Sequence, residues 1–404
     1  MLVKIKPGRA SGRVKAPPSK SFAHRMLICA AMCDGVSTVR GISDCEDVKA
    51  TLCCLSALGI KTELEGDTVR VFGKSFGEVS ANRPLYCHES GSTLRFLIPP
   101  VLLSGKTTML TGAQSLLSRP MSVYESLCKE RGMLFVNDGE SITVKGPLRG
   151  GEFNVVGNVS SQFISGLLFA LPCLKEDSRI RIAPPIESRS YIDMTIEALS
   201  SFGVKAVWEN EYTLFIKGSQ KYIPSDVTVE GDYSGAAFPE ALNLFGSEVC
   251  VEGLNPESIQ GDKIYRKYYE MLERGVPTVH IGNCPDLGPV LFAVAAGKNG
   301  GIFSGTKRLK IKESDRAEAM ARELERFGVS VTVYEDKVVV FPACFHAPTE
   351  PLQGHNDHRI VMALAVLLTV TGGEIEGAEA VSKSYPAFFD HLRALGIEVT
   401  EYEA

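Results

Sequence analysis

The sequence predicts an α/β protein with two similar domains, each containing three repeated subdomains of helices and hairpins. One observation is that six helical stretches end in a short turn closed by a glycine, and each is followed by a strand-like run. Another is that four of these six runs turn into a second strand-like run. The closing glycines are Gly59, Gly132, Gly203, Gly275, Gly328 and Gly396.

Each repeat is read in the same order along the chain. The glycine is expected to end its helix in the left-handed conformation, which glycine adopts without steric cost. The four second strands are expected at Thr68 to Phe72, Ser141 to Lys145, Tyr212 to Lys217 and Lys337 to Phe341. Because the repeat combines helices with a hairpin, it predicts a small α/β subdomain rather than one turn of a solenoid.

Six subdomains can be divided into two groups of three. We expect residues 16–225 to form one domain, and residues 1–15 and 226–404 to form the other. The loop from Tyr222 to Asp226 and the pair Pro17-Pro18 would then be the two crossings, with the first strand belonging to the second group. A cleft between domains is a favoured ligand site, so the active site is expected there.

Composition narrows the class of protein. The chain has 404 residues, 44% of them hydrophobic and 23% charged, and its net charge of −5 argues against a general nucleic-acid binder. Residues 1–6 suggest a strand rather than a signal peptide, and the longest apolar run, Ile360 to Val370, is too short to span a membrane. Eleven scattered cysteines without a C-x-x-C pair favour buried thiols in the cytoplasm over disulfides or a metal site.

The segment from Ala16 to Leu27 has the features of an anion-binding helix start. Ser19 or Ser21 would cap the helix, Lys20 would lie at its first turn, and Arg25 would follow about one turn later. A helix N-terminus favours anions through its free N–H groups and its dipole. A capped surface helix with two solvated cations explains this segment equally well.

Similar polar clusters precede other apolar runs. They are Ser90 to Arg95, Ser118 to Met121, Ser160 to Ser165, Cys284 to Leu287, Lys312 to Arg316, Asn356 to Arg359 and Ser382 to Pro386. Most of these clusters alone suggest an ordinary structural role, with Asp286 and Ser314 as expected N-caps, but capping explains only one serine of the cluster from Ser160 to Ser165. Together they place cations at equivalent positions of a repeated unit, which predicts a cationic cleft for a small polyanion in an acidic protein. Asp286 and Glu313 would be the carboxylates available there for proton transfer.

The motifs, taken in order, resemble one enzyme family across essentially the whole chain. They are Pro18-Ser-Lys-Ser with Arg25, Gly91-Ser-Thr-Leu-Arg95, Arg119-Pro120, Ser160-Ser-Gln162, Lys312 to Arg316, Asn356 to Arg359 and Lys383-Ser-Tyr-Pro386. This pattern is similar to the 5-enolpyruvylshikimate-3-phosphate synthases, the 3-phosphoshikimate 1-carboxyvinyltransferases of the shikimate pathway to chorismate and the aromatic amino acids. The resemblance implies a two-domain inverse α/β barrel of six βαβαββ subdomains, three per domain. It also implies a monomer that needs no cofactor or metal and belongs to the class of glyphosate targets.

The resemblance also implies roles for individual residues. The enzyme would transfer the enolpyruvyl group of phosphoenolpyruvate to the 5-hydroxyl of shikimate 3-phosphate through a tetrahedral intermediate. Shikimate 3-phosphate would be bound by Lys20, Ser21, Arg25, Ser160, Ser161, Gln162, Ser188, Asp286 and Lys312. Phosphoenolpyruvate would be bound by Lys20, Gly91, Arg119, Gln162, Arg316, Arg359 and Lys383. The catalytic residues would be Asp286 for the hydroxyl and Glu313 for the methylene, assisted by Lys20 and Lys383.

Three positions depart from the family pattern, and two alternatives remain. Glu89 and Arg308 stand where asparagines are usual, and Phe96 stands where a proline often follows the motif arginine. These departures leave glyphosate sensitivity and the detailed contacts open. One alternative is the sister UDP-N-acetylglucosamine 1-carboxyvinyltransferase, although the loop from Gln114 to Met121 lacks the cysteine of that enzyme. The other is a non-catalytic protein on a related repeat fold that binds a phosphate ligand or RNA.

Overall fold

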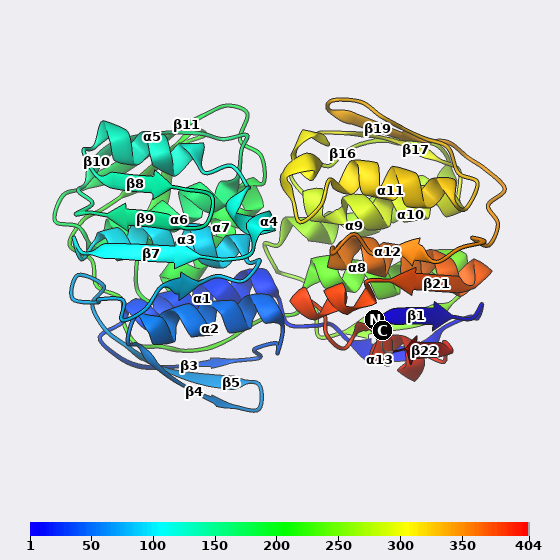
Figure 1. Ribbon diagram of the computed structural model, residues 1–404, viewed down its shortest axis with the longest axis horizontal. Helices are drawn as coiled ribbons and strands as arrows, with labels where there is room; N and C mark the ends of the chain where they lie inside the picture. Colours follow the sequence, from blue (N-terminus) through cyan, green and yellow to red (C-terminus); the bar gives the residue numbers. More distant parts are fainter. Residues whose placement is uncertain (403–404) are drawn as a thin grey trace. The chain divides into compact units, whose positions relative to one another are not determined.

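The computed structural model describes residues 1–402, which fall into two compact units (Figure 1). One unit comprises Met1–Pro17 together with the chain from Gly231 onward, and the other is Pro18–Glu230. The chain therefore crosses between the units after Pro17 and after Glu230, whereas the sequence had suggested crossings after residues 15 and 225.

Strand pairing explains the shift of these two boundaries. The strand β14 (Asp226–Thr228) pairs in parallel with β3 (Gly35–Arg40), which keeps residues 226–230 in the unit of Pro18–Glu230. At the other crossing, the Ala16 N–H donates to the Glu252 carbonyl and the Asp232 N–H donates to the Pro17 carbonyl. These bonds hold residues 16 and 17 to the unit that contains Gly231 onward.

The unit of Pro18–Glu230 contains three four-stranded sheets of the same order. Their strand orders are β14–β3–β5 (Thr68–Gly73)–β4 (Lys61–Glu65), β6 (Leu85–Tyr86)–β7 (Thr107–Thr111)–β9 (Ile142–Lys145)–β8 (Leu134–Asn137), and β10 (Gly151–Val156)–β11 (Ser178–Ala183)–β13 (Thr213–Ile216)–β12 (Ala206–Asn210). In each sheet the first two strands are parallel and the last two pairings are antiparallel. A parallel pair followed by a hairpin is the structural form of the sequence repeat.

The other unit follows the same scheme with one reduced sheet. Its sheets are β16 (Thr278–His280)–β17 (Gly301–Ser304)–β19 (Lys337–Val340)–β18 (Val331–Val333), β20 (Leu352–Gln353)–β21 (Gly373–Glu376)–β1 (Leu2–Ile5)–β22 (Val399–Tyr402), and the parallel pair β15 (Glu248–Glu252)–β2 (Ser11–Lys15). The first strand of the chain, β1, lies between β21 and β22 and is antiparallel to both. In this sheet β1 therefore occupies the third position, which β19 occupies in the sheet β16–β17–β19–β18.

Helices pack inside and over these sheets, and each unit has its own hydrophobic core. In the unit of Pro18–Glu230 they are α1 (Lys20–Met32), α2 (Glu46–Ala57), α3 (Gly91–Leu102), α4 (Gln114–Leu117), α5 (Ser122–Glu130), α6 (Ser161–Ala170) and α7 (Arg189–Ser201). In the other unit they are α8 (Tyr233–Ala241), α9 (Tyr265–Arg274), α10 (Gly288–Gly297), α11 (Arg316–Glu325), α12 (His358–Thr371) and α13 (Phe388–Ala394). The helices α1, α3, α6, α10 and α12 are buried along nearly their whole length.

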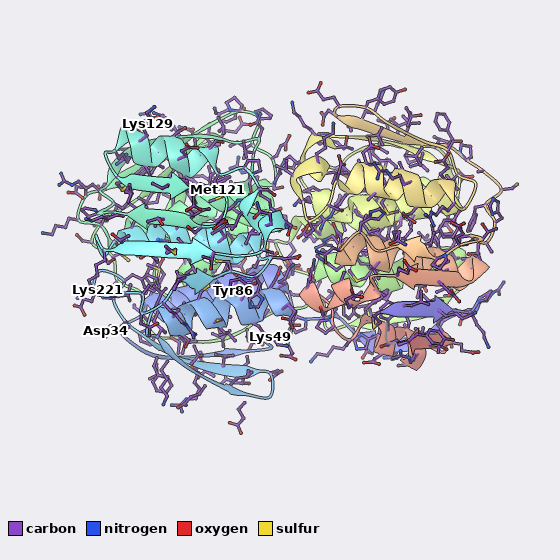
Figure 2. The ribbon with its side chains drawn as sticks, viewed as in Figure 1. Asp34, Lys49, Tyr86, Met121, Lys129 and Lys221 are labelled. Atoms are coloured by element: carbon purple, nitrogen blue, oxygen red, sulfur yellow. The ribbon has the colours of Figure 1, made fainter. Side chains whose placement is uncertain are left out.

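Outer helices carry the charged surface. Lys49 on α2 and Lys129 on α5 are exposed and project away from the core (Figure 2).

Within residues 1–402, no helix combines the length and the apolarity that a membrane span requires.

The predicted helix-closing glycines are confirmed at five of the six positions. Gly59, Gly132, Gly203, Gly328 and Gly396 have φ between 67° and 93°. Gly275 is the exception, because its φ of 166° is extended backbone. Val276, which follows Gly275, precedes Pro277, and a residue before a proline avoids the helical region, so the chain continues in an extended conformation here.

Candidate active site

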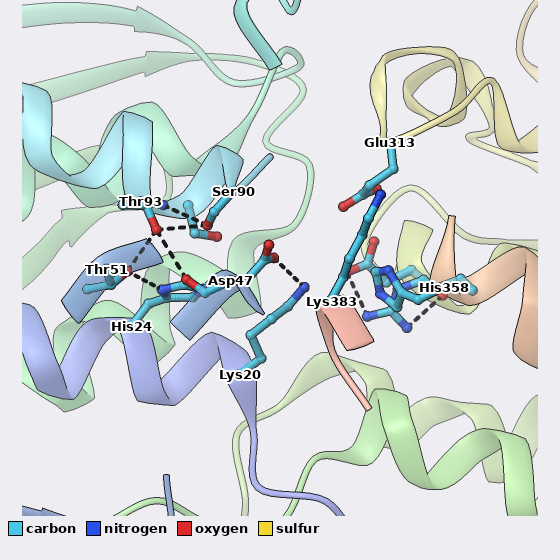
Figure 3. Close-up of polar contacts among 12 residues, drawn as sticks. Lys20, His24, Asp47, Thr51, Ser90, Thr93, Glu313, His358 and Lys383 are labelled. Atoms are coloured by element: carbon cyan, nitrogen blue, oxygen red, sulfur yellow. Dashed lines mark hydrogen bonds and ion pairs between the residues drawn. The ribbon is translucent and has the colours of Figure 1, made fainter. Parts of the chain in front are cut away.

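The start of α1 presents Lys20 beside a carboxylate. Ser19, rather than Ser21, caps the helix, and its Oγ accepts the Phe22 N–H at 3.4 Å. Lys20 Nζ lies 2.8 Å from Oδ2 of Asp47, which is in the first turn of α2 (Figure 3). Both side chains are largely buried, so the pair is better shielded from water than an ordinary surface ion pair. A cation is thus held ready at a helix start.

The start of α3 is surrounded by cationic groups. Ser90 caps this helix by accepting the Thr93 N–H at 3.2 Å. A Cβ atom added at Gly91 would lie 3.2 Å from Nη1 of Arg119, 3.4 Å from Nη1 of Arg95 and 3.5 Å from Oε1 of Gln162. Two guanidinium groups and an amide therefore surround the glycine backbone, which is an arrangement suited to an anion at a helix N-terminus.

Arg119 has donors that the protein itself does not use. Its Nε and Nη2 atoms are buried, and neither has a hydrogen-bond partner among residues 1–402. Buried donors are normally satisfied, so two open nitrogens on one guanidinium indicate a place for an anionic ligand. The neighbouring Arg95 is instead engaged, because its Nη1 donates to Oε1 of Gln162 at 2.8 Å.

Arg25 uses much of its guanidinium group to bind other parts of the protein, whereas the sequence suggested a ligand-binding role. It is buried, its Nε donates to Oγ1 of Thr195 at 2.8 Å, and its Nη1 and Nη2 donate to the carbonyls of Ser21 and Tyr191. Burial lowers the pKa of Arg25 to about 10. These bonds clamp α1 to α7, and only the remaining N–H groups can meet a ligand.

Four further expected residues lie at the starts of α6 and α7. Ser160 caps α6 by accepting the Gln162 N–H at 3.3 Å, and Ser161 is the first residue of that helix. Gln162 Nε2 donates to Oγ of Ser92 at 3.0 Å, which links the starts of α6 and α3. Ser188 is buried just before α7 and has a left-handed φ of 56°, a strained conformation that is frequent at functional sites.

In the other unit, Asp286 lies among three cations. Its Oδ1 is 3.0 Å from Nζ of Lys312 and 2.8 Å from Nη1 of Arg316, and its Oδ2 is 3.2 Å from Nη2 of Arg359. Burial acts to raise the pKa of Asp286, but the charges of Arg359, Lys312 and Arg316 outweigh it and hold that pKa well below its usual range. In this state Asp286 is a carboxylate that neutralises a cationic site.

Arg316 is the centre of a second set of ion pairs. Its Nη2 is 2.6 Å from Oε2 of Glu313, and its Nε is 2.8 Å from Oδ2 of Asp357. Burial lowers the pKa of Arg316, but the carboxylates of Asp357, Glu313 and Asp286 raise it overall, so the guanidinium stays charged. Asp357 also caps α12 and accepts the hydroxyl of Ser314 at 3.1 Å, so the start of α12 is tied to the start of α11.

Two expected helix caps are wrong. Asp286 does not cap α10, because it lies in a 3-10 turn (Pro285–Leu287) and its carboxylate faces the three cations instead. Asp315, not Ser314, caps α11 by accepting the Glu318 N–H. In both cases the side chain contacts charged groups from distant segments instead of the helix backbone: Asp286 contacts three cations, and Ser314 donates to Asp357. Local spacing does not reveal these contacts.

Lys383 lies in the same unit on a separate segment. Its Nζ donates to the backbone carbonyl of Asn356 at 2.6 Å and to Oδ1 of Asn356 at 2.7 Å. Asn356 precedes the cap of α12 and has a left-handed φ of 51°. Lys383 is thereby held beside the turn that carries Asp357 and Arg359.

The expected site residues therefore form two groups, one in each unit. The first contains Lys20, Ser21, Arg25, Gly91, Arg119, Ser160, Ser161, Gln162 and Ser188, and the second contains Asp286, Lys312, Glu313, Arg316, Arg359 and Lys383. The departures from the family pattern lie nearby in the chain: Glu89 is half-buried just before the cap of α3, and Arg308 is buried in a 3-10 turn before Lys312.

Sequence reasoning missed Asp47 and Asp357 as members of these groups, and it gave Arg95 no role. Asp47 is an acidic residue in the first turn of α2, and Asp357 is the cap of α12, so each looks locally like an ordinary helix-start residue. The roles of Asp47 and Asp357 show only in their ion pairs with Lys20 and Arg316. These pairs form between segments that are distant in the sequence, so the sequence carries no local sign of them.

Comparisons with known proteins identify the family of the chain. A family model described as EPSP synthase (3-phosphoshikimate 1-carboxyvinyltransferase) matches residues 5–277 and 271–392. A 3-phosphoshikimate 1-carboxyvinyltransferase of Clostridium botulinum (strain Alaska E43 / Type E3) is 38% identical over 422 residues, which cover 97% of this chain and 97% of the relative. Another, from Clostridium kluyveri, is 38% identical over 429 residues and covers 99% of this chain and 98% of its own.

The fold also matches a solved structure. An EPSP synthase from Acinetobacter baumannii superposes with a TM-score of 0.78 at 23% identity, covering 99% of this chain and 100% of that one. This match confirms the predicted fold class of mixed α/β structure with repeated βαβ units in two domains. With both the sequence and the fold in agreement, the chain belongs to the EPSP synthase family, the 3-phosphoshikimate 1-carboxyvinyltransferases.

Proposed function

We propose that this protein transfers the enolpyruvyl group of phosphoenolpyruvate to the 5-hydroxyl of shikimate 3-phosphate and releases phosphate, as a step of the shikimate pathway. In the addition step, the hydroxyl oxygen bonds to C2 of phosphoenolpyruvate while its methylene carbon gains a proton. In the elimination step, the bond from C2 to the phosphate oxygen breaks and the methyl carbon loses a proton. The reaction needs one group for the hydroxyl proton and one for the carbon proton.

The observation that carries this proposal is the position of Asp286 among Lys312, Arg316 and Arg359. Three cations meet at this one carboxylate in a protein of net charge −5, and Arg316 is also paired with Glu313 and Asp357. A substrate phosphate or carboxylate can share these cations with Asp286. A site for a doubly anionic substrate therefore comes with a carboxylate already in place.

The open donors of Arg119 supply the matching feature in the other unit. Its two unpartnered nitrogens, together with the backbone at Gly91, are suited to one anionic end of phosphoenolpyruvate. We propose that Lys20, Gly91, Arg119, Gln162, Arg316, Arg359 and Lys383 bind phosphoenolpyruvate, and that Lys20, Ser21, Arg25, Ser160, Ser161, Gln162, Ser188, Asp286 and Lys312 bind shikimate 3-phosphate. That both groups of residues act from one cleft stays a prediction.

Asp286 and Glu313 are proposed as the acid–base pair. Without substrate, the pKa of Asp286 is too low for an effective base. Substrate anions would pair with Arg359, Lys312 and Arg316 and so weaken the stabilisation that these cations give to the Asp286 carboxylate. The pKa of Asp286 would then rise when the 5-hydroxyl must lose its proton. Glu313 would give a proton to the methylene carbon and take one back during elimination, with Lys20 and Lys383 stabilising developing charge.

The direct test measures phosphate release from phosphoenolpyruvate with two acceptors in parallel. Release with shikimate 3-phosphate, and none with UDP-N-acetylglucosamine, is the expected result. The family membership favours this outcome over the sister enzyme, and the net charge of −5 weighs against an RNA-binding protein. Release with the nucleotide sugar alone, or with neither acceptor, would refute the proposal.

Gly91→Ala should raise the KM for phosphoenolpyruvate about tenfold, since one displaced charge-assisted hydrogen bond has about that effect. The added methyl would lie 3.2 Å from Nη1 of Arg119 and 3.5 Å from Oε1 of Gln162, in the space proposed for the ligand. Steady-state kinetics with each substrate varied in turn is the measurement. Gly275→Ala, after the end of α9 with open space around it and an extended backbone, is the control. An unchanged KM for phosphoenolpyruvate in Gly91→Ala would remove Gly91 from the binding site.

The cellular setting is also a proposal. All eleven cysteines are free thiols, several of them buried, which supports a reducing compartment such as the cytoplasm. The monomeric state stays a prediction, which sedimentation of the purified protein would test.

A further inference from the structure

Two hydrogen-bonded rungs join α1 to α2 behind the first group of site residues. The outer rung is the ion pair of Lys20 and Asp47, with Nζ and Oδ2 2.8 Å apart. The inner rung is neutral, with Nδ1 of His24 2.8 Å from Oγ1 of Thr51 (Figure 3). His24 follows Lys20 by four residues on α1, and Thr51 follows Asp47 by four residues on α2, so each pair stacks on one helix face.

The inner rung continues to α3 through two more hydroxyls. Thr51 Oγ1 is 2.7 Å from Oγ1 of Thr93, whose hydroxyl lies 2.8 Å from Oγ of the helix cap Ser90. Thr93 Oγ1 also lies 3.5 Å from the carbonyl of Asp47, at the limit of a hydrogen bond. The result is one chain of polar contacts that joins the starts of three helices (Figure 3).

The chain of contacts is buried, and the fixed cap orders its protons. His24, Thr51, Thr93 and Ser90 are all fully buried. Because Ser90 Oγ accepts from the Thr93 backbone, the Thr93 hydroxyl can donate to Ser90 and the Thr51 hydroxyl to Thr93. His24 then donates from Nδ1 to Thr51, which leaves Nε2 as an acceptor, and that atom has no partner among residues 1–402.

The imidazole remains neutral in this position. Burial lowers the pKa of His24 well below its usual value, and the charges of Lys20 and Arg25 lower it further. A neutral ring has two tautomers, and the hydrogen bond to Thr51 selects the one protonated at Nδ1; the ring adds no charge to the cations at the helix starts. The direction of the hydrogen bonds is therefore constant across physiological pH.

We propose that His24 and Thr51 are positioning residues for the anion site at the start of α3, a role that rests on the proposed function. When a substrate anion binds Lys20, the outer rung to Asp47 must loosen or share its cation. The inner rung stays closed and keeps α1, α2 and the cap Ser90 in register. Gly91, which directly follows the cap Ser90, thus keeps its geometry while Lys20 changes partner.

Thr51→Val tests this role because valine keeps the shape and removes the hydroxyl. The KM for phosphoenolpyruvate should rise about tenfold, the effect of breaking one buried polar link, while kcat and the KM for shikimate 3-phosphate change less than about threefold. Thr51→Ser should restore the KM for phosphoenolpyruvate. Thr108→Val, a buried threonine on β7, is the matched control and should leave all three constants unchanged.

A second measurement does not depend on turnover. In the full-length protein with 15N-labelled histidines, the His24 ring should be neutral and protonated at Nδ1 between pH 6 and 8. Thr51→Val should disturb that tautomer and weaken the binding of inorganic phosphate about tenfold by calorimetry. Thr93→Val gives the same test if Thr51→Val does not fold.

The outcomes separate the two proposals. If the unmodified protein does not turn over, the proposed function fails, and the tautomer and phosphate measurements still decide the role of the inner rung. A KM for phosphoenolpyruvate within twofold of normal in Thr51→Val, unchanged phosphate binding, or an equal effect of Thr108→Val would overturn the positioning role.

Discussion

Asp286→Asn should lower kcat at least a hundredfold, which is about the contribution of a positioned acid–base group. Asparagine keeps the size of the side chain and can still contact Lys312 and Arg359, but it cannot take a proton from the 5-hydroxyl. The KM values should change far less than kcat, because the surrounding cations remain. Steady-state rates of phosphate release measure this effect, and turnover near the normal rate would remove Asp286 from the mechanism.

The stability of the same variant serves as its control. The pKa of folded Asp286 lies well below its ordinary value of 3.8, so the ionised carboxylate stabilises the fold fully above pH 4 and loses that contribution as the pH falls through the folded-state pKa. Chemical denaturation should therefore show a deficit in Asp286→Asn that is constant near neutral pH and shrinks in acid. A deficit that grows in acid would contradict the assigned ion pairs.

Lys20→Met should damage both binding and rate, and it is expected to have the largest effect on affinity. A cation next to two anionic substrates stabilises the ground state and the developing charge together, so kcat/KM should fall at least about a thousandfold. Calorimetry with each substrate alone should show weaker binding of both. Unchanged affinity for both substrates would refute the shared role of Lys20.

The control for Lys20 must account for its partner. Removing the lysine leaves the carboxylate of Asp47 largely buried without that cation, which destabilises the fold for reasons unrelated to catalysis. The double variant Lys20→Met with Asp47→Asn relieves this charge and should recover stability without recovering activity. Lys49→Met, which removes an exposed lysine from α2, should leave both unchanged.

The repeated architecture could be predicted because its signals are local. Each helix-closing glycine, such as Gly59 or Gly396, lies within a few residues of the strand that follows it. The conformational freedom of glycine therefore marks the end of the helix directly in the sequence. The domain boundaries could not be placed to the residue. They depend on the pairing of β14 with β3, and these two strands are nearly two hundred residues apart in the chain.

The candidate site was predictable in its cations and less so in its carboxylates. Lys20, Arg316 and Arg359 stand at helix starts, where spacing alone suggests anion binding. Asp286 was misread as a cap, because the local rule was overridden by three cations from distant segments. Asp47 was missed because its relation to Lys20 exists only after α1 and α2 have packed together.

The placement of β1 between β21 and β22 has a consequence for the order of folding during synthesis. Pro18–Glu230 is a continuous segment, so this unit can complete its core while the ribosome is still translating the rest. Leu2–Ile5 is synthesised long before Gly373–Glu376 and Val399–Tyr402, the strands with which it pairs. The strand β1 is therefore fixed in the native structure only after its partners have been made, and nascent chains stalled before residue 373 should present it to a protease or a chaperone.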